Sequence, residues 1–245
     1  MILWFLGYPD QALQRIQDAL ALAQKLSHPY SLGFALYYFA WVHQQRGEPQ
    51  GVQERVDTMV AWATEQGFTR WVLQGAVLQG WLLVQQGKGQ EGLLEMRRGH
   101  GGSTREQSYE AALLAEAYGR EGQTEEGLKV VTEELAWVNK MSRRFYEAEL
   151  FRIKGYLVLS QEKKNPKPIH GSEAETCFRQ GIEIARKQGA KSLELRAAMS
   201  LSRLWQKQGK KPEARRLLAE VYDWFTEGFN TADLKGAKAL LDELS

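Results

Sequence analysis

Apolar and polar residues recur along the chain with the spacing of amphipathic helices. Segments such as Tyr30–Gln45, Trp71–Gln86 and Glu106–Arg120 keep this spacing for about four turns. No run shows the strict alternation that is typical of a half-buried β-strand. The pattern therefore predicts an all-α protein.

Five glycines divide the helical segments into units. Each follows one amphipathic stretch and precedes the next, at spacings of 40, 40, 35 and 87 residues, and the last gap holds two units. These glycines are Gly7, Gly47, Gly87, Gly122 and Gly209. Pro9, Pro49 and Pro212 follow two or three residues later, where the first turn of a helix accepts proline. We therefore predict that each glycine forms the corner of a helical hairpin.

Small residues stand at a fixed distance from these corners. Those seven positions before a corner are Ala40, Gly80, Ala115 and Ser202, and Gly155 takes the same role in the fifth unit. The position five residues after a corner is also mostly small, and the position nine residues after is apolar. We expect the small residues to let the two helices of each hairpin approach closely.

Repeats of this length fit two helical architectures. HEAT and armadillo repeats have about 40 to 47 residues, and tetratricopeptide (TPR) repeats have about 34. The spacing favours the former, but the order of small residue, corner glycine, small residue and bulky apolar residue favours the TPR, with each helix extended by most of a turn. We predict a right-handed TPR-like superhelix of about six units over residues 1–226, the first unit incomplete. Residues 227–245 then form a C-terminal capping helix, with Thr231 as its N-cap.

Two segments interrupt the repeat. Arg97–Thr104 contains three glycines, so the second helix of its unit should be short or frayed. Gln161–Gly171 contains Pro166 and Pro168 and predicts a longer surface loop inside the fifth unit.

Four segments carry a more specific likeness. They are Ala112–Leu128, Cys177–Glu183, Lys191–Leu201 and Leu217–Leu244. Together they resemble the C-terminal TPR region of large bacterial signalling proteins, in which a class III adenylate or guanylate cyclase or another input domain precedes a STAND-type AAA ATPase and then the repeats. Asn230 and Gly236 depart from that pattern. The resemblance implies a regulatory or protein-interaction region, and any cyclase or ATPase activity would belong to domains upstream, because Met1–Leu6 already covers only the tail of a first helix.

The chain lacks motifs for catalysis, metal binding or cofactor binding. Gly99–Thr104 has glycines and hydroxyls but no lysine of a phosphate-binding loop. The four histidines are scattered, and Cys177 lies on an amphipathic segment where a core position is expected. Most carboxylates stand at helical spacing from a base, as in Glu149 with Arg152, and such pairs usually lie on solvated faces. We therefore predict no enzyme activity, no metal site and no cofactor.

The composition, the short apolar run at the start and the single cysteine indicate the cellular compartment. An apolar content of 43% and a charged content of 25% are typical of a globular protein and exclude a disordered or collagen-like chain. The opening run Ile2–Leu6 is too short for a signal peptide or a membrane span, and the single cysteine cannot form an internal disulfide. These features favour a cytoplasmic protein without a membrane contact.

The first helix of each TPR unit lines the concave face, so the small-residue anchors predict which side chains meet a partner. We expect the following on that face: Phe34, Tyr37, Trp41, Trp81, Tyr109, Arg152, Tyr156, Arg196 and Arg203. Aromatic and arginine side chains dominate binding hot spots, although aromatic residues on a repeat helix more often serve packing. Tyr37, Trp41, Val77 and Trp81 replace the lysines and asparagines that grip a terminal carboxylate in some TPR domains. An apolar or mixed peptide, or another domain of the same chain, is therefore the expected ligand.

The net charge of +2 hides an asymmetry. Residues 1–122 carry 10 basic and 12 acidic side chains, and residues 123–245 carry 22 and 18. The segment 186–216 has ten basic residues against Glu194 and Glu213, but no nucleic-acid motif accompanies it, so a solvated helix pair is the favoured reading. We predict a non-catalytic interaction scaffold that can self-associate through an uncapped N-terminal end. The alternative is a ligand- or peptide-sensing repeat domain of a transcription regulator.

Overall fold

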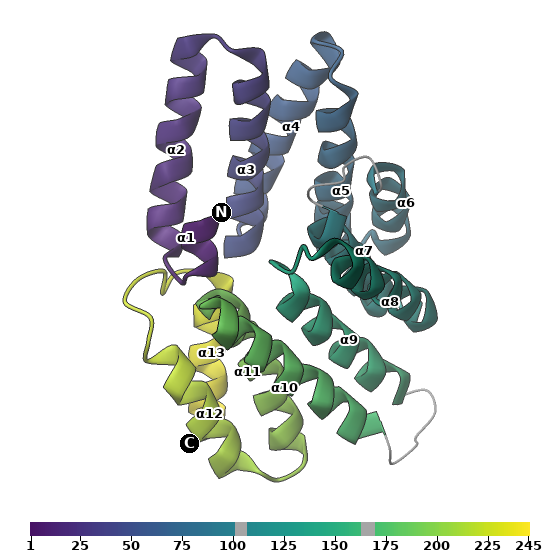
Figure 1. Cartoon of the computed structure of the whole chain (residues 1–245), viewed down its shortest axis with the longest axis vertical. Helices are drawn as coiled ribbons and strands as arrows, with labels where there is room; N and C mark the ends of the chain where they lie inside the picture. Colours follow the sequence, from purple (N-terminus) through teal and green to yellow (C-terminus); the bar gives the residue numbers. More distant parts are fainter. Residues whose placement is uncertain (101–106, 163–169) are drawn as a thin grey trace.

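Helices make up the fold throughout the part of the chain that the computed structural model describes, which is residues 1–100, 107–162 and 170–245. No strand occurs in these ranges, so the all-α prediction is confirmed. The helices are α1 (Ile2–Phe5), α2 (Pro9–Leu26), α3 (Pro29–Arg46), α4 (Pro49–Glu65), α5 (Thr69–Gln85), α6 (Gly89–Gly99), α7 (Gln107–Arg120), α8 (Thr124–Met141), α9 (Glu147–Glu162), α10 (His170–Gln188), α11 (Lys191–Lys207), α12 (Lys211–Tyr222) and α13 (Ala232–Glu243). They pack in successive pairs, as Figure 1 shows.

The corner glycines have the backbone conformation that the sequence predicts. Gly7, Gly47, Gly87, Gly122 and Gly209 all have positive φ angles, between 73° and 91°. Glycine adopts this left-handed conformation without the steric cost of a Cβ atom. α2 and α4 then begin at proline, and α12 has proline in its first turn.

Small residues bring the two helices of a pair into backbone contact. A Cβ atom on Gly80 of α5 would lie 2.5 Å from the carbonyl oxygen of Gly92 in α6. The Ser202 hydroxyl of α11 donates a hydrogen bond of 3.0 Å to the carbonyl of Ala214 in α12. The predicted close approach is therefore present at both corners.

The first helix of each pair lies inside the curve and the second lies outside. α3, α7 and α11 each have 11 buried residues, whereas α4 has four, α8 six and α12 three. Burial on almost every side explains why α3 is apolar around its circumference, because an inner helix packs against its own pair and both neighbouring pairs.

The two predicted interruptions have different outcomes. α6 has 11 residues and ends at Gly99, so it is shorter than α4 with 17 and α8 with 18, as predicted. The predicted loop at 161–171 is too long at both ends, because Gln161 and Glu162 belong to α9 and His170 and Gly171 to α10. Residues 101–106 and 163–169 lie outside the described ranges.

The curve of the chain brings its first residues against its last third (Figure 1). One carboxylate oxygen of Glu227 accepts hydrogen bonds from the backbone amides of Asp10 and Gln11, at 2.9 and 3.0 Å. Arg46, at the end of α3, pairs with Asp10 at 2.7 Å and donates to Asn230 at 3.2 Å. Glu227 therefore caps α2 across more than 200 residues of sequence.

The contacts of α1 and α13 bear on two predictions. α1 packs on one side only: the Trp4 side chain is buried and its carbonyl accepts a hydrogen bond from Ser192 of α11, whereas Met1 and Ile2 are exposed. Thr231 does precede α13, but its hydroxyl donates to the carbonyl of Gly228 at 2.7 Å and caps no helical amide. Self-association stays a prediction.

Replacing Gly80 by alanine should destabilise the protein, although alanine favours a helix over glycine by about 1 kcal/mol. The added methyl group would meet the Gly92 carbonyl, a backbone atom that cannot rotate away. Gly236→Ala is the matched control, because its methyl group would meet only the flexible end of Met199 at 3.1 Å. Chemical denaturation should show a lower unfolding free energy for Gly80→Ala and an equal or higher one for Gly236→Ala. Equal effects of the two substitutions would contradict this packing.

Candidate functional site

The inner helices enclose a polar cavity of about 480 Å³, which we call the charged groove. Helices α3, α5, α7, α9, α11 and α13 all contribute to its wall. Its lining includes Gln44, Gln45, Trp81, Leu113, Glu116, Arg120, Tyr146, Glu149, Arg152, Ile153, Arg196, Met199, Arg203 and Asp233. Because each of the six helices belongs to a different pair or cap, the groove exists only when the whole array is folded.

Arg196 of α11 connects the walls of the groove. Its guanidinium binds Asp233 of α13 at 2.8 Å and the side-chain and backbone carbonyls of Gln45 at 2.9 and 3.1 Å. It lies 3.5 Å from Glu149 of α9 and covers the Trp4 ring at 4.7 Å from the ring centre. Burial alone would lower the pKa of Arg196, but Asp233 and Glu149 raise it above its ordinary value. The side chain is therefore a permanent cation.

Glu149 and Arg152 form a buried ion pair on the groove side of α9. Two hydrogen bonds of 2.8 Å join the guanidinium to both carboxylate oxygens, and the Glu149 side chain is only 4% exposed. The prediction that this pair lies on a solvated face was wrong, because α9 is an inner helix that other pairs cover. Burial alone would raise the pKa of Glu149, but Arg152 and Arg196 lower it below its ordinary value.

Arg203 differs from the other arginines of the groove. Arg120 and Arg152 approach Glu116 at 3.4 and 3.9 Å, but Arg203 makes no ion pair or hydrogen bond with any described residue. Partial desolvation of the guanidinium and the neighbouring charge of Arg152 lower the pKa of Arg203, although the side chain as a whole is exposed. The groove thus holds four guanidinium groups against the carboxylates of Glu116, Glu149 and Asp233, and the excess positive charge lies at Arg203.

The predicted partner-binding residues fall into three groups. Trp81, Arg152, Arg196 and Arg203 line the charged groove. Tyr37, Trp41 and Tyr109 are at most 2% exposed and pack within the core, where Trp41 and Tyr109 also border a second cavity. Phe34 and Tyr156 are half-buried, where Phe34 packs against Trp71 and Tyr156 lies beside Gly119. The structure therefore brings four of the nine together in one cavity.

A layer of buried polar side chains ends the groove at one side. The Tyr109 hydroxyl donates to Gln44 at 3.1 Å, and Gln45 donates to the Tyr146 hydroxyl at 3.3 Å. Burial raises the pKa of both tyrosines, so their hydroxyls stay protonated. Two adjacent glutamines near the end of a largely apolar helix, Gln44 and Gln45, are the sequence signal for this layer.

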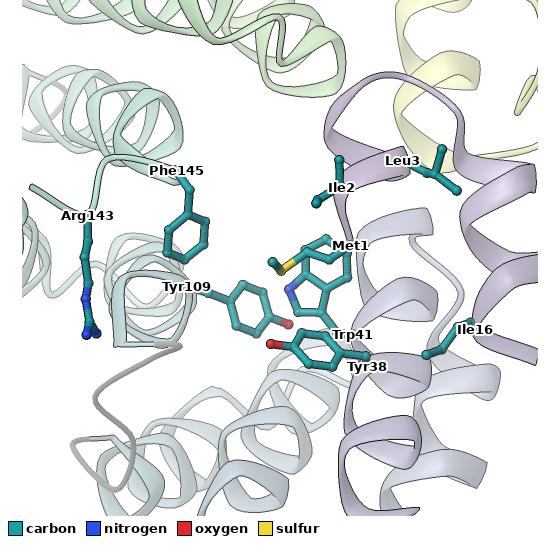
Figure 2. Close-up of a pocket in the computed structure, with 9 residues that line it drawn as sticks. All are labelled: Met1, Ile2, Leu3, Ile16, Tyr38, Trp41, Tyr109, Arg143 and Phe145. Carbon is teal, nitrogen blue, oxygen red and sulfur yellow. The ribbon is translucent and has the colours of Figure 1, made fainter. Parts of the chain in front are cut away.

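A second cavity follows the first along the same helices, on the other side of this layer. It measures about 830 Å³ and is mostly apolar, and we call it the apolar pocket (Figure 2). On α3, α7 and the start of α9, the residues that line it precede those that line the charged groove. Its lining is Met1, Ile2, Leu3, Ile16, Tyr38, Trp41, Tyr109, Arg143 and Phe145.

The basic segment 186–216 is not one continuous cationic surface. Arg186 and Lys191 both bind Glu194, at 2.7 and 2.8 Å, and Arg196 belongs to the buried network of the groove. Lysines at the corner between α11 and α12 are exposed, as are Arg215 and the groove residue Arg203. The positive charge therefore divides between internal ion pairs, the groove and this corner.

The described part of the chain gives little support for a metal site, a nucleophilic cysteine or a membrane-spanning helix. No cluster of three or more histidine, cysteine, aspartate or glutamate residues within it could hold a metal ion. Burial raises the pKa of the Cys177 thiol, which disfavours the nucleophilic thiolate. None of the helices described has the length and apolar character needed to cross a bilayer.

No protein-family model matches the chain, and no curated protein matches it either.

The acid sensitivity of the protein should depend on Glu149. A carboxyl whose folded-state pKa is lowered stabilises the fold above its unfolded-state pKa, and this stabilisation is lost as the pH falls through the lowered value. Glu149→Gln should therefore reduce the loss of unfolding free energy between pH 5 and pH 2. At pH 7 it should cost about 3 to 5 kcal/mol, because Arg152 and Arg196 lose a buried partner.

Glu134 provides a control with the opposite sign. Burial raises its pKa despite hydrogen bonds from Ser108 and Gln107. Glu134 therefore stabilises the fold at low pH and loses this effect as the pH rises through the raised folded-state value. Denaturation curves for Glu149→Gln and Glu134→Gln should change the pH dependence in opposite directions. The same change in both variants would contradict the assigned network.

Proposed function

We propose that the chain is a non-catalytic protein-interaction module whose charged groove binds a short segment of a partner protein with an acidic side chain. One observation carries the proposal: Arg203 lies in the groove without a carboxylate partner among the described residues, beside the half-buried Trp81 ring and other apolar side chains. A carboxylate of the ligand would supply the missing charge, and hydrogen bonds to charged groups are the stronger ones.

The groove is large enough to hold a few side chains of a bound segment. Its volume of about 480 Å³ falls in the usual range for ligand cavities, about 300 to 1,000 Å³. Glu116, Glu149 and Asp233 already bind arginines of the groove, so they hold the wall in place before a ligand arrives. A preorganised wall reduces the ordering that binding requires.

The proposal includes a TPR-like repeat architecture and a regulatory role. Hairpins with left-handed corner glycines, inner first helices and small residues at each crossing support a TPR-like superhelix. The resemblance of Ala112–Leu128 and the C-terminal segments to bacterial signalling proteins supports a cytoplasmic, regulatory role.

Selection from a random twelve-residue peptide library tests the proposal. We expect the protein to enrich peptides with aspartate or glutamate near an apolar residue. Arg203→Glu should weaken the selected peptides by at least about tenfold in a fluorescence titration, because it removes a charge-assisted hydrogen bond and adds repulsion. Arg203 is exposed and unpaired, so the melting temperature should stay close to that of the wild type.

Arg215→Glu is the matched control, since Arg215 is exposed on α12 outside the groove. If Arg215→Glu keeps its affinity for the selected peptides and Arg203→Glu loses it, the charged groove is supported as their binding site. Equal losses in both, or a library without acidic enrichment, would reject it.

A further inference from the structure

The balance of charges in the charged groove limits the charge of the ligand that it can hold. Four guanidinium groups and three carboxylates line it, and no lysine or histidine is among the described lining residues. The arginines are Arg120, Arg152, Arg196 and Arg203, and the carboxylates are Glu116, Glu149 and Asp233. The groove therefore has one positive charge in excess, which a ligand with a single negative charge neutralises.

The three carboxylates differ in how firmly they are held. Glu149 and Asp233 accept hydrogen bonds of 2.8 Å from arginines of the wall. Arg120 and Arg152 approach Glu116 at 3.4 and 3.9 Å, and its side chain is 27% exposed, against 4% for Glu149. Of the three, Glu116 therefore contributes least to holding the wall, although it adds a full negative charge to the groove.

The charge of Glu116 acts on the same part of the groove as Arg203. Partial desolvation and then the charge of Arg152 lower the pKa of Arg203, so the two guanidinium groups lie close enough to repel each other. Arg152 in turn lies 3.9 Å from Glu116. The charges of Asp233 and Glu243 also reach Arg203, without an ion-pair contact. An anion that binds Arg203 therefore lies next to Arg152 and within the field of several carboxylates.

We propose that the charged groove selects a ligand group with one negative charge, a carboxylate, and rejects a phosphorylated side chain, and that Glu116 determines this specificity. The inference rests on the proposed function and names the chemical class of its ligand. A phosphoserine carries about 1.5 to 2 negative charges at pH 7. The first charge neutralises the excess of the groove, and the second is repelled by the resident carboxylates, more strongly than it would be in water.

The pairing of the arginines also distinguishes the groove from a phosphate site. Proteins that recognise phosphorylated side chains do so with clusters of arginines that pair with the phosphate oxygens. In the charged groove, Arg120, Arg152 and Arg196 already pair with carboxylates of the wall, and Arg203 makes no ion pair with a described residue. One available guanidinium matches the two oxygens of a carboxylate.

Three pools of fluorescent peptides test this specificity with the full chain. The peptides have twelve residues, with aspartate, phosphoserine or serine fixed at the sixth position and random residues elsewhere. At pH 7.5 the wild type should bind the aspartate pool at least about tenfold more tightly than the phosphoserine pool, because the second phosphate charge is repelled. The measurement is the apparent dissociation constant in a fluorescence polarisation titration.

Glu116→Gln removes the negative charge and keeps the size of the side chain. It leaves Arg120 and Arg152 with less compensation and raises the excess of the groove to two positive charges. The variant should therefore bind the phosphoserine pool as tightly as the aspartate pool, or more tightly. Its melting temperature should stay near that of the wild type, because partly exposed ion pairs contribute little to stability.

Glu175→Gln is the matched control. Glu175 pairs with Arg179 at 2.8 Å across one helical turn, as Glu116 does with Arg120, and its side chain is 20% exposed. It lies on α10 and does not line the groove. This variant gains the same net charge as Glu116→Gln and should keep the aspartate preference of the wild type.

The outcomes separate this inference from the proposed function. An aspartate preference over phosphoserine in the wild type and in Glu175→Gln that Glu116→Gln removes would establish it. Equal binding of both pools by the wild type would overturn it, and so would a preference that Glu116→Gln leaves unchanged, because a steric barrier would survive an isosteric substitution. If the wild type binds the aspartate pool no better than the serine pool, the proposed function fails and the inference is rejected with it.

Discussion

The fold depends on the buried guanidinium of Arg196. It binds α3 through Gln45, α13 through Asp233 and α1 through the Trp4 ring, and it approaches Glu149 of α9. A buried charge is tolerated only when partners compensate for its lost hydration, so these elements must take their positions together.

Local rules account for what the sequence predicted well. A corner such as Gly47 or Gly209 depends on the backbone of a few residues, and the contact between Gly80 and Gly92 depends on neighbouring helices of one pair. Counting from these anchors also gives four residues that line the charged groove, namely Trp81, Arg152, Arg196 and Arg203. It cannot show what lies opposite a predicted face, and Trp41 is buried because Trp4 and Tyr109 pack against it from distant parts of the chain.

The same limit explains why the sequence does not predict whether a charged residue is buried or exposed. An Asp233 near the start of a helix, or a Glu149 three residues before an arginine, has the same local sequence whether it faces water or another helix. Closure of the array decides between them, because it places α13 and α9 on either side of α11. The groove therefore combines residues whose roles cannot be read from the sequence of a single repeat. Arg203 is recognised as the cation without a carboxylate partner only once the pairs of the other groove arginines are known.

The cap that Glu227 places on α2 has a consequence for how the molecule unfolds. In an ordinary solenoid each repeat touches only its neighbours, so the end repeats can unfold while the middle stays intact. Here the first outer helix is held by a residue more than 200 positions away, and Arg46 holds Asn230 nearby. Opening of the α2 N-terminus therefore also breaks contacts of the segment between α12 and α13, so the two regions are coupled although more than 200 residues separate them.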